Sequence, residues 1–196
     1  MFRRLLIILF LITLLIPLYG RIPFSAGLQY SSYTLYMDDE DAEITGGFGG
    51  EIGITDILPH IGLKLRMSKI RFTTSAENIP YDYEYMPVSL CTSFDMLPFY
   101  DAFWLSLTME TGFGYYFWKG MQNDEIVILP TGGKMDERDY GFLGGFTIQL
   151  KPLRNIAIEF STRYNYIASS NIHKYGYFDK DEKLWENGIG IKYLIQ

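Results

Sequence analysis

Apolar and polar residues alternate over long stretches of this chain, which is the pattern of β-strands rather than of helices. The clearest stretch covers residues 103–118, and another covers residues 185–196 at the end of the sequence. Successive side chains of a strand point to opposite faces, so each stretch predicts a strand with one apolar face. The same rule predicts eight strands, at about residues 23–36, 44–55, 60–72, 82–95, 102–118, 140–150, 155–167 and 184–196.

The connections between these strands differ in length at the two ends. Three are short and contain proline, at residues 56–59, 96–101 and 151–154. The others are longer or acidic, at residues 38–41, 73–81, 119–139 and 169–183. Short turns at one end and long loops at the other are typical of outer-membrane barrels. We therefore predict an all-β fold, an eight-stranded antiparallel up-and-down transmembrane β-barrel with short periplasmic turns and longer extracellular loops.

Charged residues are divided unequally between the two phases of each predicted strand, that is, between the two sets of alternate residues that point to opposite faces. One phase carries no charge in the middle of any predicted strand, and its exceptions, Lys69 and Arg71, come near the end of the third strand. The other phase mixes charges with glycines, and Asp95 and Glu186 belong to it. Inside a narrow barrel, glycine leaves room for long side chains, and opposite charges can pair across the interior. We expect an apolar outer surface and a polar network in the lumen, made by Glu51, Lys64, Arg66, Glu110, Glu159, Arg163 and Lys192.

Aromatic residues gather toward both ends of the predicted strands. Two aromatic belts are what the two interfaces of a membrane favour. A simpler explanation is that aromatic residues are common in strands of any kind. The expected belt near the long loops includes Tyr33, Phe72, Tyr83, Tyr115, Trp118, Tyr140 and Trp185, and the belt near the short turns includes Phe24 and Tyr193.

Composition excludes several classes of protein. Aromatic residues make up 17% of the chain and charged residues only 20%, which is not the composition of a disordered protein. The net charge of −6 argues against nucleic acid as a partner. The single cysteine, Cys91, cannot form an internal disulfide, and His60 and His173 are too far apart in sequence to suggest a zinc site. We predict no metal and no cofactor.

The N-terminus has the features of a secretory leader. Arg3 and Arg4 precede an uncharged apolar run, Leu5–Leu18, which is shorter than the roughly 20 residues that span a bilayer as a helix. We predict a signal peptide at residues 1–20 and a barrel domain at residues 21–196; an uncleaved anchor is the alternative.

With this leader, the eight strands and the terminal segment Gly188–Gln196, the chain resembles the small eight-stranded outer-membrane β-barrels: the OmpA transmembrane domain, OmpX, OmpW and the opacity-type proteins. The resemblance implies a place in the bacterial outer membrane, with both termini in the periplasm and lipid around the wall. It further implies that the assembly machinery recognises the C-terminal strand and that the long loops meet an extracellular partner. Members often end in an aromatic residue, whereas this chain ends in Gln196.

The function that we predict is a structural or surface-interaction role with a salt-bridged, plugged lumen and no catalysis. One alternative is a narrow channel for small solutes, as in OmpW, lined by the lumen charges. A second is a lipid-modifying barrel enzyme that uses Ser169 or Ser170 with His173 and Glu182. A third is a soluble ligand-binding barrel, whose apolar phase would face inward.

Two loop segments carry further hypotheses. Asp38, Asp39, Glu40 and Asp41 form an acidic run that would suit a divalent cation or a surface partner, or is simply a solvated loop. The apolar run Ile126–Pro130 within the longest loop is expected to extend a hairpin beyond the membrane. The alternative is an exposed apolar patch that binds a partner.

Overall fold

The computed structural model describes residues 23–37, 40–73, 82–97, 104–168 and 181–195. Eight long strands and one two-residue strand account for most of this part of the chain. Their bounds are β1 Phe24–Met37, β2 Glu40–Leu58, β3 Ile61–Phe72, β4 Asp82–Asp95, β5 Leu105–Gln122, β6 Glu125–Ile126, β7 Asp136–Leu153, β8 Ile156–Ala168 and β9 Glu182–Ile195.

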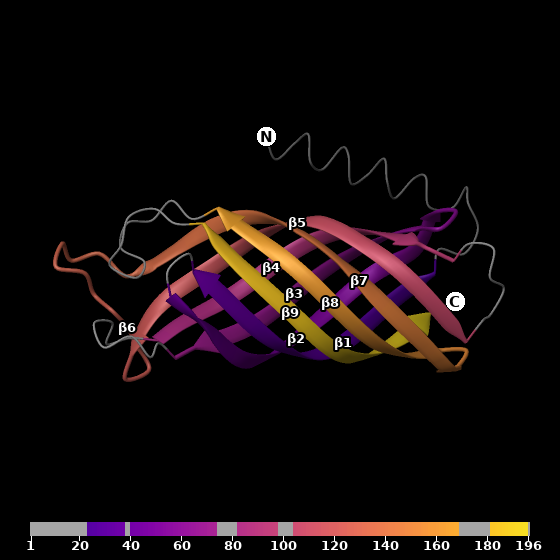
Figure 1. Cartoon of the computed structure of the whole chain (residues 1–196), viewed down its shortest axis with the longest axis horizontal. Coiled ribbons are helices and arrows are strands. Elements are labelled where there is room, and N and C mark those ends of the chain that lie inside the picture. Colours follow the sequence, from indigo (N-terminus) through magenta and orange to yellow (C-terminus); the bar gives the residue numbers. More distant parts are fainter. Residues whose placement is uncertain (1–22, 38–39, 74–81, 98–103, 169–180, 196) are drawn as a thin grey trace.

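The long strands form one closed antiparallel barrel (Figure 1). Each long strand pairs with the next one in the sequence, and the first and last strands, β1 and β9, pair with each other. Phe24 at the start of β1 lies opposite Ile195 at the end of β9, so both ends of the described barrel meet at one rim. The prediction of an eight-stranded antiparallel β-barrel is confirmed.

The observed strands differ from the predicted ones mainly where β5 and β7 extend beyond the barrel wall. β5 continues to Gln122 and turns at Asn123 and Asp124, whose positive φ angles of 52° and 64° suit a two-residue hairpin turn. β6 then pairs back onto β5, and a further bridge joins Ile128 to Lys134. The prediction that the apolar run Ile126–Pro130 extends this hairpin is confirmed, and its place beyond the membrane stays a prediction.

Two connections at the opposite end are tight turns. Pro59 and His60 join β2 to β3, and Arg154 and Asn155 join β7 to β8. His60 has a φ of 67°, which a short turn of this kind requires. Most residues of the predicted loops 73–81 and 169–183 lie outside the described part of the chain, whereas the segment 119–139 is described in full.

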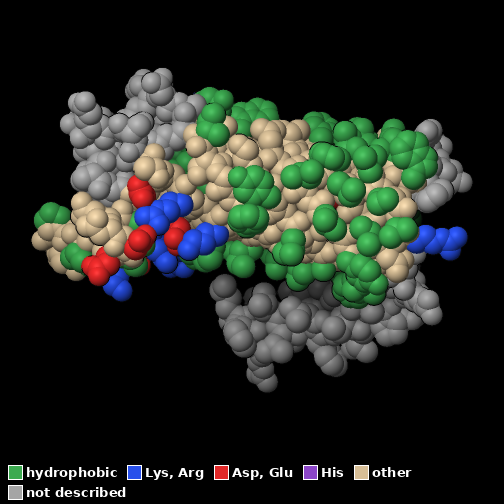
Figure 2. Space-filling model, turned by 90° about the horizontal axis from the view of Figure 1, so that it is seen from below, with side chains coloured by type: hydrophobic (Ala, Val, Ile, Leu, Met, Phe, Trp, Pro, Cys, Tyr) green, Lys and Arg blue, Asp and Glu red, His purple; other side chains and the backbone are tan. Residues whose placement is uncertain are grey.

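The outer surface of the barrel is apolar over most of its height (Figure 2). Leu28 and Phe48 are 77% and 74% exposed, whereas their neighbours along the strands, Gln29 and Gly47, are buried. Charged side chains on the visible face gather mainly at one end (Figure 2). The expected outward direction of the apolar phase is therefore confirmed. No helix within the described residues is long and apolar enough to cross a membrane.

Candidate functional site in the barrel interior

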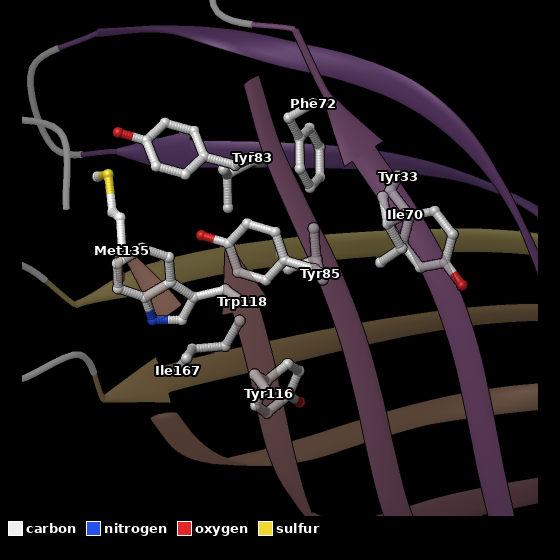
Figure 3. Packing of buried hydrophobic residues seen from close by; sticks show 11 residues of the cluster. Tyr33, Ile70, Phe72, Tyr83, Tyr85, Tyr116, Trp118, Met135 and Ile167 are labelled. Atoms are coloured by element: carbon white, nitrogen blue, oxygen red, sulfur yellow. The ribbon is translucent and has the colours of Figure 1, made fainter. Parts of the chain in front are cut away.

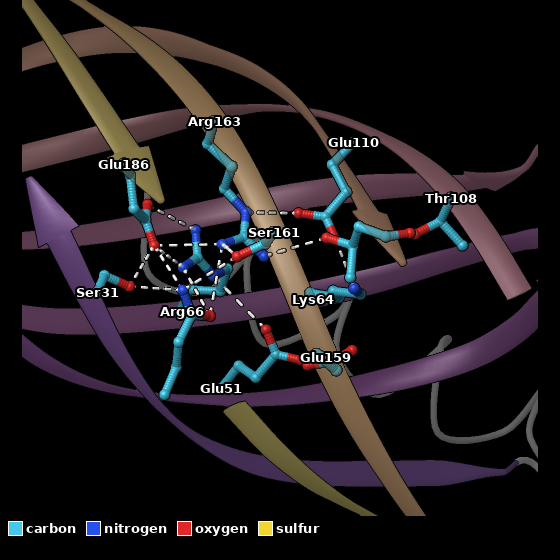
Figure 4. A network of polar contacts seen from close by, with 12 residues as sticks. Ser31, Glu51, Lys64, Arg66, Thr108, Glu110, Glu159, Ser161, Arg163 and Glu186 are labelled. Atoms are coloured by element: carbon cyan, nitrogen blue, oxygen red, sulfur yellow. Dashed lines mark hydrogen bonds and ion pairs between the residues drawn. The ribbon is translucent and has the colours of Figure 1, made fainter. Parts of the chain in front are cut away.

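Eight charged side chains meet in the middle of the barrel interior (Figure 4). They come from five strands, and the inward phase of each of these strands carries one or two of the charges. None is more than 9% exposed. Four are acids and four are bases: Glu51 on β2, Lys64 and Arg66 on β3, Glu110 on β5, Glu159 and Arg163 on β8, and Glu186 and Lys192 on β9. The group therefore includes all seven residues proposed from the sequence and adds Glu186.

Glu110 accepts contacts on both of its carboxylate oxygens. Lys64 Nζ lies 2.5 Å from Oε1, and Arg163 Nε lies 2.7 Å from Oε2. The hydroxyl of Thr147 also donates to Oε1, at 2.9 Å. A buried carboxylate is stable only when its lone pairs are satisfied in this way, so these three contacts hold Glu110 tightly in place.

Glu186 is the second centre of the network. Arg66 Nη2 donates to its Oε1 at 2.6 Å, and Arg163 Nη1 donates to the same oxygen at 3.2 Å. Gln29 donates to this oxygen at 2.9 Å and to the hydroxyl of Ser31 at 2.6 Å. Arg163 thus joins the two carboxylates, Glu110 and Glu186, into one cluster.

The remaining charges continue this cluster. Arg66 Nε lies 3.5 Å from Glu51 Oε2, and Lys192 Nζ forms ion pairs with both Glu51 and Glu159. Gln149 donates to Glu159 at 2.6 Å. The network therefore runs without interruption across the interior and has no net charge.

Glycines leave the space that these long side chains occupy. A Cβ on Gly145 would lie 2.3 Å from the carbonyl oxygen of Thr162 and 2.8 Å from Cγ of Arg163. A Cβ on Gly188 would lie 1.9 Å from Nε2 of Gln29. All three separations are far below van der Waals contact, so a larger residue at either position is incompatible with the observed arrangement. The expectation that inward glycines make room is confirmed.

Between this network and the rim beside the β5–β7 hairpin, the interior is filled by an apolar and aromatic cluster (Figure 3). Val127 and Leu129 of the hairpin pack against this cluster. Hydroxyl groups of the cluster bond to polar side chains: the Tyr116 hydroxyl donates to Asn165 at 2.9 Å, and the Tyr85 hydroxyl donates to Glu182 at 3.0 Å. The members are Tyr33, Leu35, Ile70, Phe72, Tyr83, Tyr85, Tyr116, Trp118, Met135, Ile167 and Leu184.

This cluster corrects the expected aromatic belt. Tyr33, Phe72, Tyr83 and Trp118, predicted to face the membrane interface, instead point inward and are at most 2% exposed. The prediction was wrong because, at this end, both phases of the strands are aromatic and the inward phase carries few charges. Other predicted members of both belts do face outward, namely Tyr115, Tyr140 and Trp185 near the hairpin end and Phe24 and Tyr193 near the other.

A cavity of about 10 Å³ lies between the network and the cluster, bordered by Tyr33, Arg66 and Glu186. The same cavity reaches Pro87, where the pairing of β3 with β4 skips two positions because proline has no N–H to donate. A volume of this size holds about one water molecule.

The other residues proposed from the sequence lie elsewhere. Asp38, Asp39, Ser169, Ser170 and His173 fall outside the described residues, and the side chains of Glu40 and Asp41 are not described. Asp95 is not part of the network: it ends β4, and its Oδ2 lies 3.9 Å from Nδ1 of His60.

The two outward basic residues form ion pairs at the rim. Lys69 pairs with Glu84, and Arg71 pairs with Asp82 and Asp124. Within the described part of the chain, no group of three or more His, Cys, Asp and Glu side chains could hold a metal ion.

Neither a scan of protein-family models nor a search of curated protein sequences matches this chain. Solved structures match it closely in fold. The Neisserial surface protein A superposes with a TM-score of 0.67 at 10% identity, covering 87% of this chain and 96% of that protein. The attachment invasion locus protein Ail of Yersinia pestis superposes with a TM-score of 0.57 at 16% identity, covering 89% of this chain and 99% of that protein. The outer membrane protein OprG of Pseudomonas aeruginosa superposes with a TM-score of 0.53 at 10% identity, covering 90% of this chain and 97% of that protein. The chain therefore has the fold of small outer-membrane barrels.

Proposed function

We propose that this protein is an integral outer-membrane β-barrel with a sealed interior, which acts as a structural or surface-interaction protein and not as a channel. The observation that carries the proposal is that the usual arrangement of a water-soluble barrel is inverted: the apolar phase faces outward over most of the described wall, and a balanced set of ion pairs lies inside. A barrel in water would bury the apolar phase instead.

The size of the apolar surface supports a membrane location. Soluble monomers rarely expose apolar patches larger than about 300–600 Å². Here outward leucine, isoleucine and phenylalanine residues are exposed on strands all around the barrel, from Leu28 on β1 to Ile191 on β9. In a lipid bilayer these apolar side chains contact hydrocarbon instead of water, so their outward direction is not unfavourable there.

The packing of the interior supports a seal. An ion passing along the axis would have to break the pairs that Arg163 and Arg66 make with Glu110, Glu186 and Glu51. It would then meet the aromatic cluster, which leaves a cavity of only about 10 Å³ beside the network. Eight strands enclose an interior that side chains can fill, so a sealed lumen is what this geometry favours.

We infer that the end bearing the β5–β7 hairpin faces the cell exterior and that both termini lie in the periplasm. Residues 1–20 would then act as the export signal and β9 as the strand that the assembly machinery recognises. Ail of Yersinia pestis, which has a similar fold, was solved in complex with the heparin analogue sucrose octasulfate. The loops and hairpin at this end are the surface on which we place partner binding.

Two measurements on the full chain test this proposal. We expect the protein in the outer-membrane fraction, and we expect the unboiled barrel to migrate differently from the boiled chain on detergent gels. Recovery from the soluble periplasmic fraction without a boiling-dependent shift would contradict the proposal and favour a soluble barrel.

A further inference from the structure

One outward residue does not fit the lipid-facing surface. On β9 the outward residues include Trp185, Ile189, Ile191 and Tyr193, but the residue between Trp185 and Ile189 is Asn187. Trp185 and Tyr193 are 41% and 51% exposed and belong to the two aromatic belts. From Trp185 to Tyr193 the chain rises about 27 Å along the strand, which is about 20 Å along the barrel axis when the strands are tilted by about 40°. Asn187 therefore lies within the apolar band.

The carboxamide of Asn187 is exposed and makes no hydrogen bond to any residue that the structure describes. Its direct neighbours on the adjacent strands are Ser32 on β1 and Thr162 on β8, and together the three form a polar row across the wall. Serine and threonine hydroxyls can bond to nearby backbone carbonyls, whereas a carboxamide carries two donors and an acceptor. Hydrocarbon satisfies none of these groups.

The surface around this row is uneven. Leu28, Phe48 and Ile191 project with exposures of 65–77%, and small residues, Ala26 and Gly50, lie among them on the same face. The outward residues of β1, and those of β2 from Ile44 to Ile54, carry no charge. Close packing of protein on protein in a membrane uses small residues in this way, together with an occasional polar side chain.

We propose that this face, formed by β8, β9, β1 and β2, binds a second copy of the same barrel, with the Asn187 carboxamides paired across a two-fold axis. A carboxamide is complementary to itself, because each can donate to the oxygen of the other. A two-fold interface brings the same residue of both copies together, so one Asn187 per chain suffices for two hydrogen bonds. The inference rests on the proposed function, since it requires the wall to be in lipid.

Cross-linking in liposomes tests the interface. Ser32→Cys places a thiol beside Asn187, and Thr111→Cys is the matched control, since Thr111 is also exposed and lies on β5, four strands away from β1 on the far side of the barrel. The native Cys91 is buried and does not compete. Each variant is reconstituted in phosphatidylcholine liposomes at increasing lipid-to-protein ratios and treated with a short bis-maleimide.

We expect a covalent dimer from Ser32→Cys that persists on dilution with lipid, and only a dilution-dependent trace from Thr111→Cys. Adding Asn187→Leu should reduce the specific dimer by about 3- to 30-fold, the range expected for hydrogen bonds within a membrane. Equal cross-linking at both positions, or no effect of Asn187→Leu, would show that lipid or another protein covers this face and would overturn the inference. A protein that neither floats with liposomes nor shifts on boiling would overturn the proposed function as well.

Discussion

Replacing Arg163 tests whether the interior network is dry and closed. Arg163 is 1% exposed and joins the two halves of the network, donating to Glu110 at 2.7 Å, to Ser161 at 2.7 Å and to Glu186 at 3.2 Å. Arg163→Met keeps an unbranched chain but removes the guanidinium. Four acids would then face three bases.

The expected cost follows from these contacts. Two hydrogen bonds to carboxylates, at about 1.5–3 kcal/mol each, give about 3–6 kcal/mol. Removing one partner of a buried ion pair costs about 3–5 kcal/mol in other proteins. We therefore expect Arg163→Met to lower the free energy of unfolding by about 3–5 kcal/mol. Adding Glu110→Gln restores the charge balance. The double variant should therefore lose less free energy of unfolding than the two single variants lose in sum.

Urea unfolding of the barrel in lipid vesicles measures this free energy, with the fraction of unboiled protein that migrates as folded as the signal. Arg71→Met is the control, because Arg71 is 42% exposed and makes its ion pairs at the rim, where such pairs contribute less than about 1 kcal/mol. The opposite result is that Arg163→Met lowers the free energy of unfolding no more than Arg71→Met does, with no coupling between Arg163→Met and Glu110→Gln. That result would show that the interior is solvated and would contradict a dry, closed network.

Three further predictions concern the rest of the barrel. Trp118→Ala removes the largest side chain of the aromatic cluster and should lower the free energy of unfolding by about 3–5 kcal/mol in the same urea titration. Gly145→Ala should reduce the yield of heat-modifiable barrel because its Cβ would meet the backbone of β8. Gly144→Ala should fold normally, because its Cβ would lie 3.9 Å from the carbonyl oxygen of Glu110; equal yields of the two variants would contradict the assignment. Leu129→Asp should free the hairpin from the cluster and increase protease cleavage between β5 and β7, with the boiling-dependent shift retained; unchanged cleavage would show that this contact does not hold the hairpin.

The fold could be predicted from the sequence because a period of two is a local signal. Each alternating stretch defined a strand, and charges next to glycines distinguished the inward phase. Depth along the barrel is not local, since it depends on the register between strands. For this reason the inward phase alone did not separate Asp95 from Glu186, although Glu186 lies in the network, 2.6 Å from Arg66, and Asp95 lies near His60 at the end of a strand.

The aromatic cluster could not be predicted for a different reason. Tyrosine, phenylalanine and tryptophan suit both a membrane interface and a packed interior, so their presence near strand ends does not indicate direction. The phase of Trp118 is the same as that of Glu110 on the same strand, and this agreement was the signal that could have placed Trp118 inside. The self-complementary position of Asn187 likewise became visible only when its neighbours on β1 and β8 were known.

Ion conductance of the purified full chain in a planar lipid bilayer tests the sealed barrel most directly. We expect no regular conductance steps from the wild-type protein if, as proposed, paired charges and the aromatic cluster seal its interior. Regular ohmic steps, with an amplitude or ion selectivity that changes in Arg163→Met but not in Arg71→Met, would contradict this proposal and show that the interior charges line a pore.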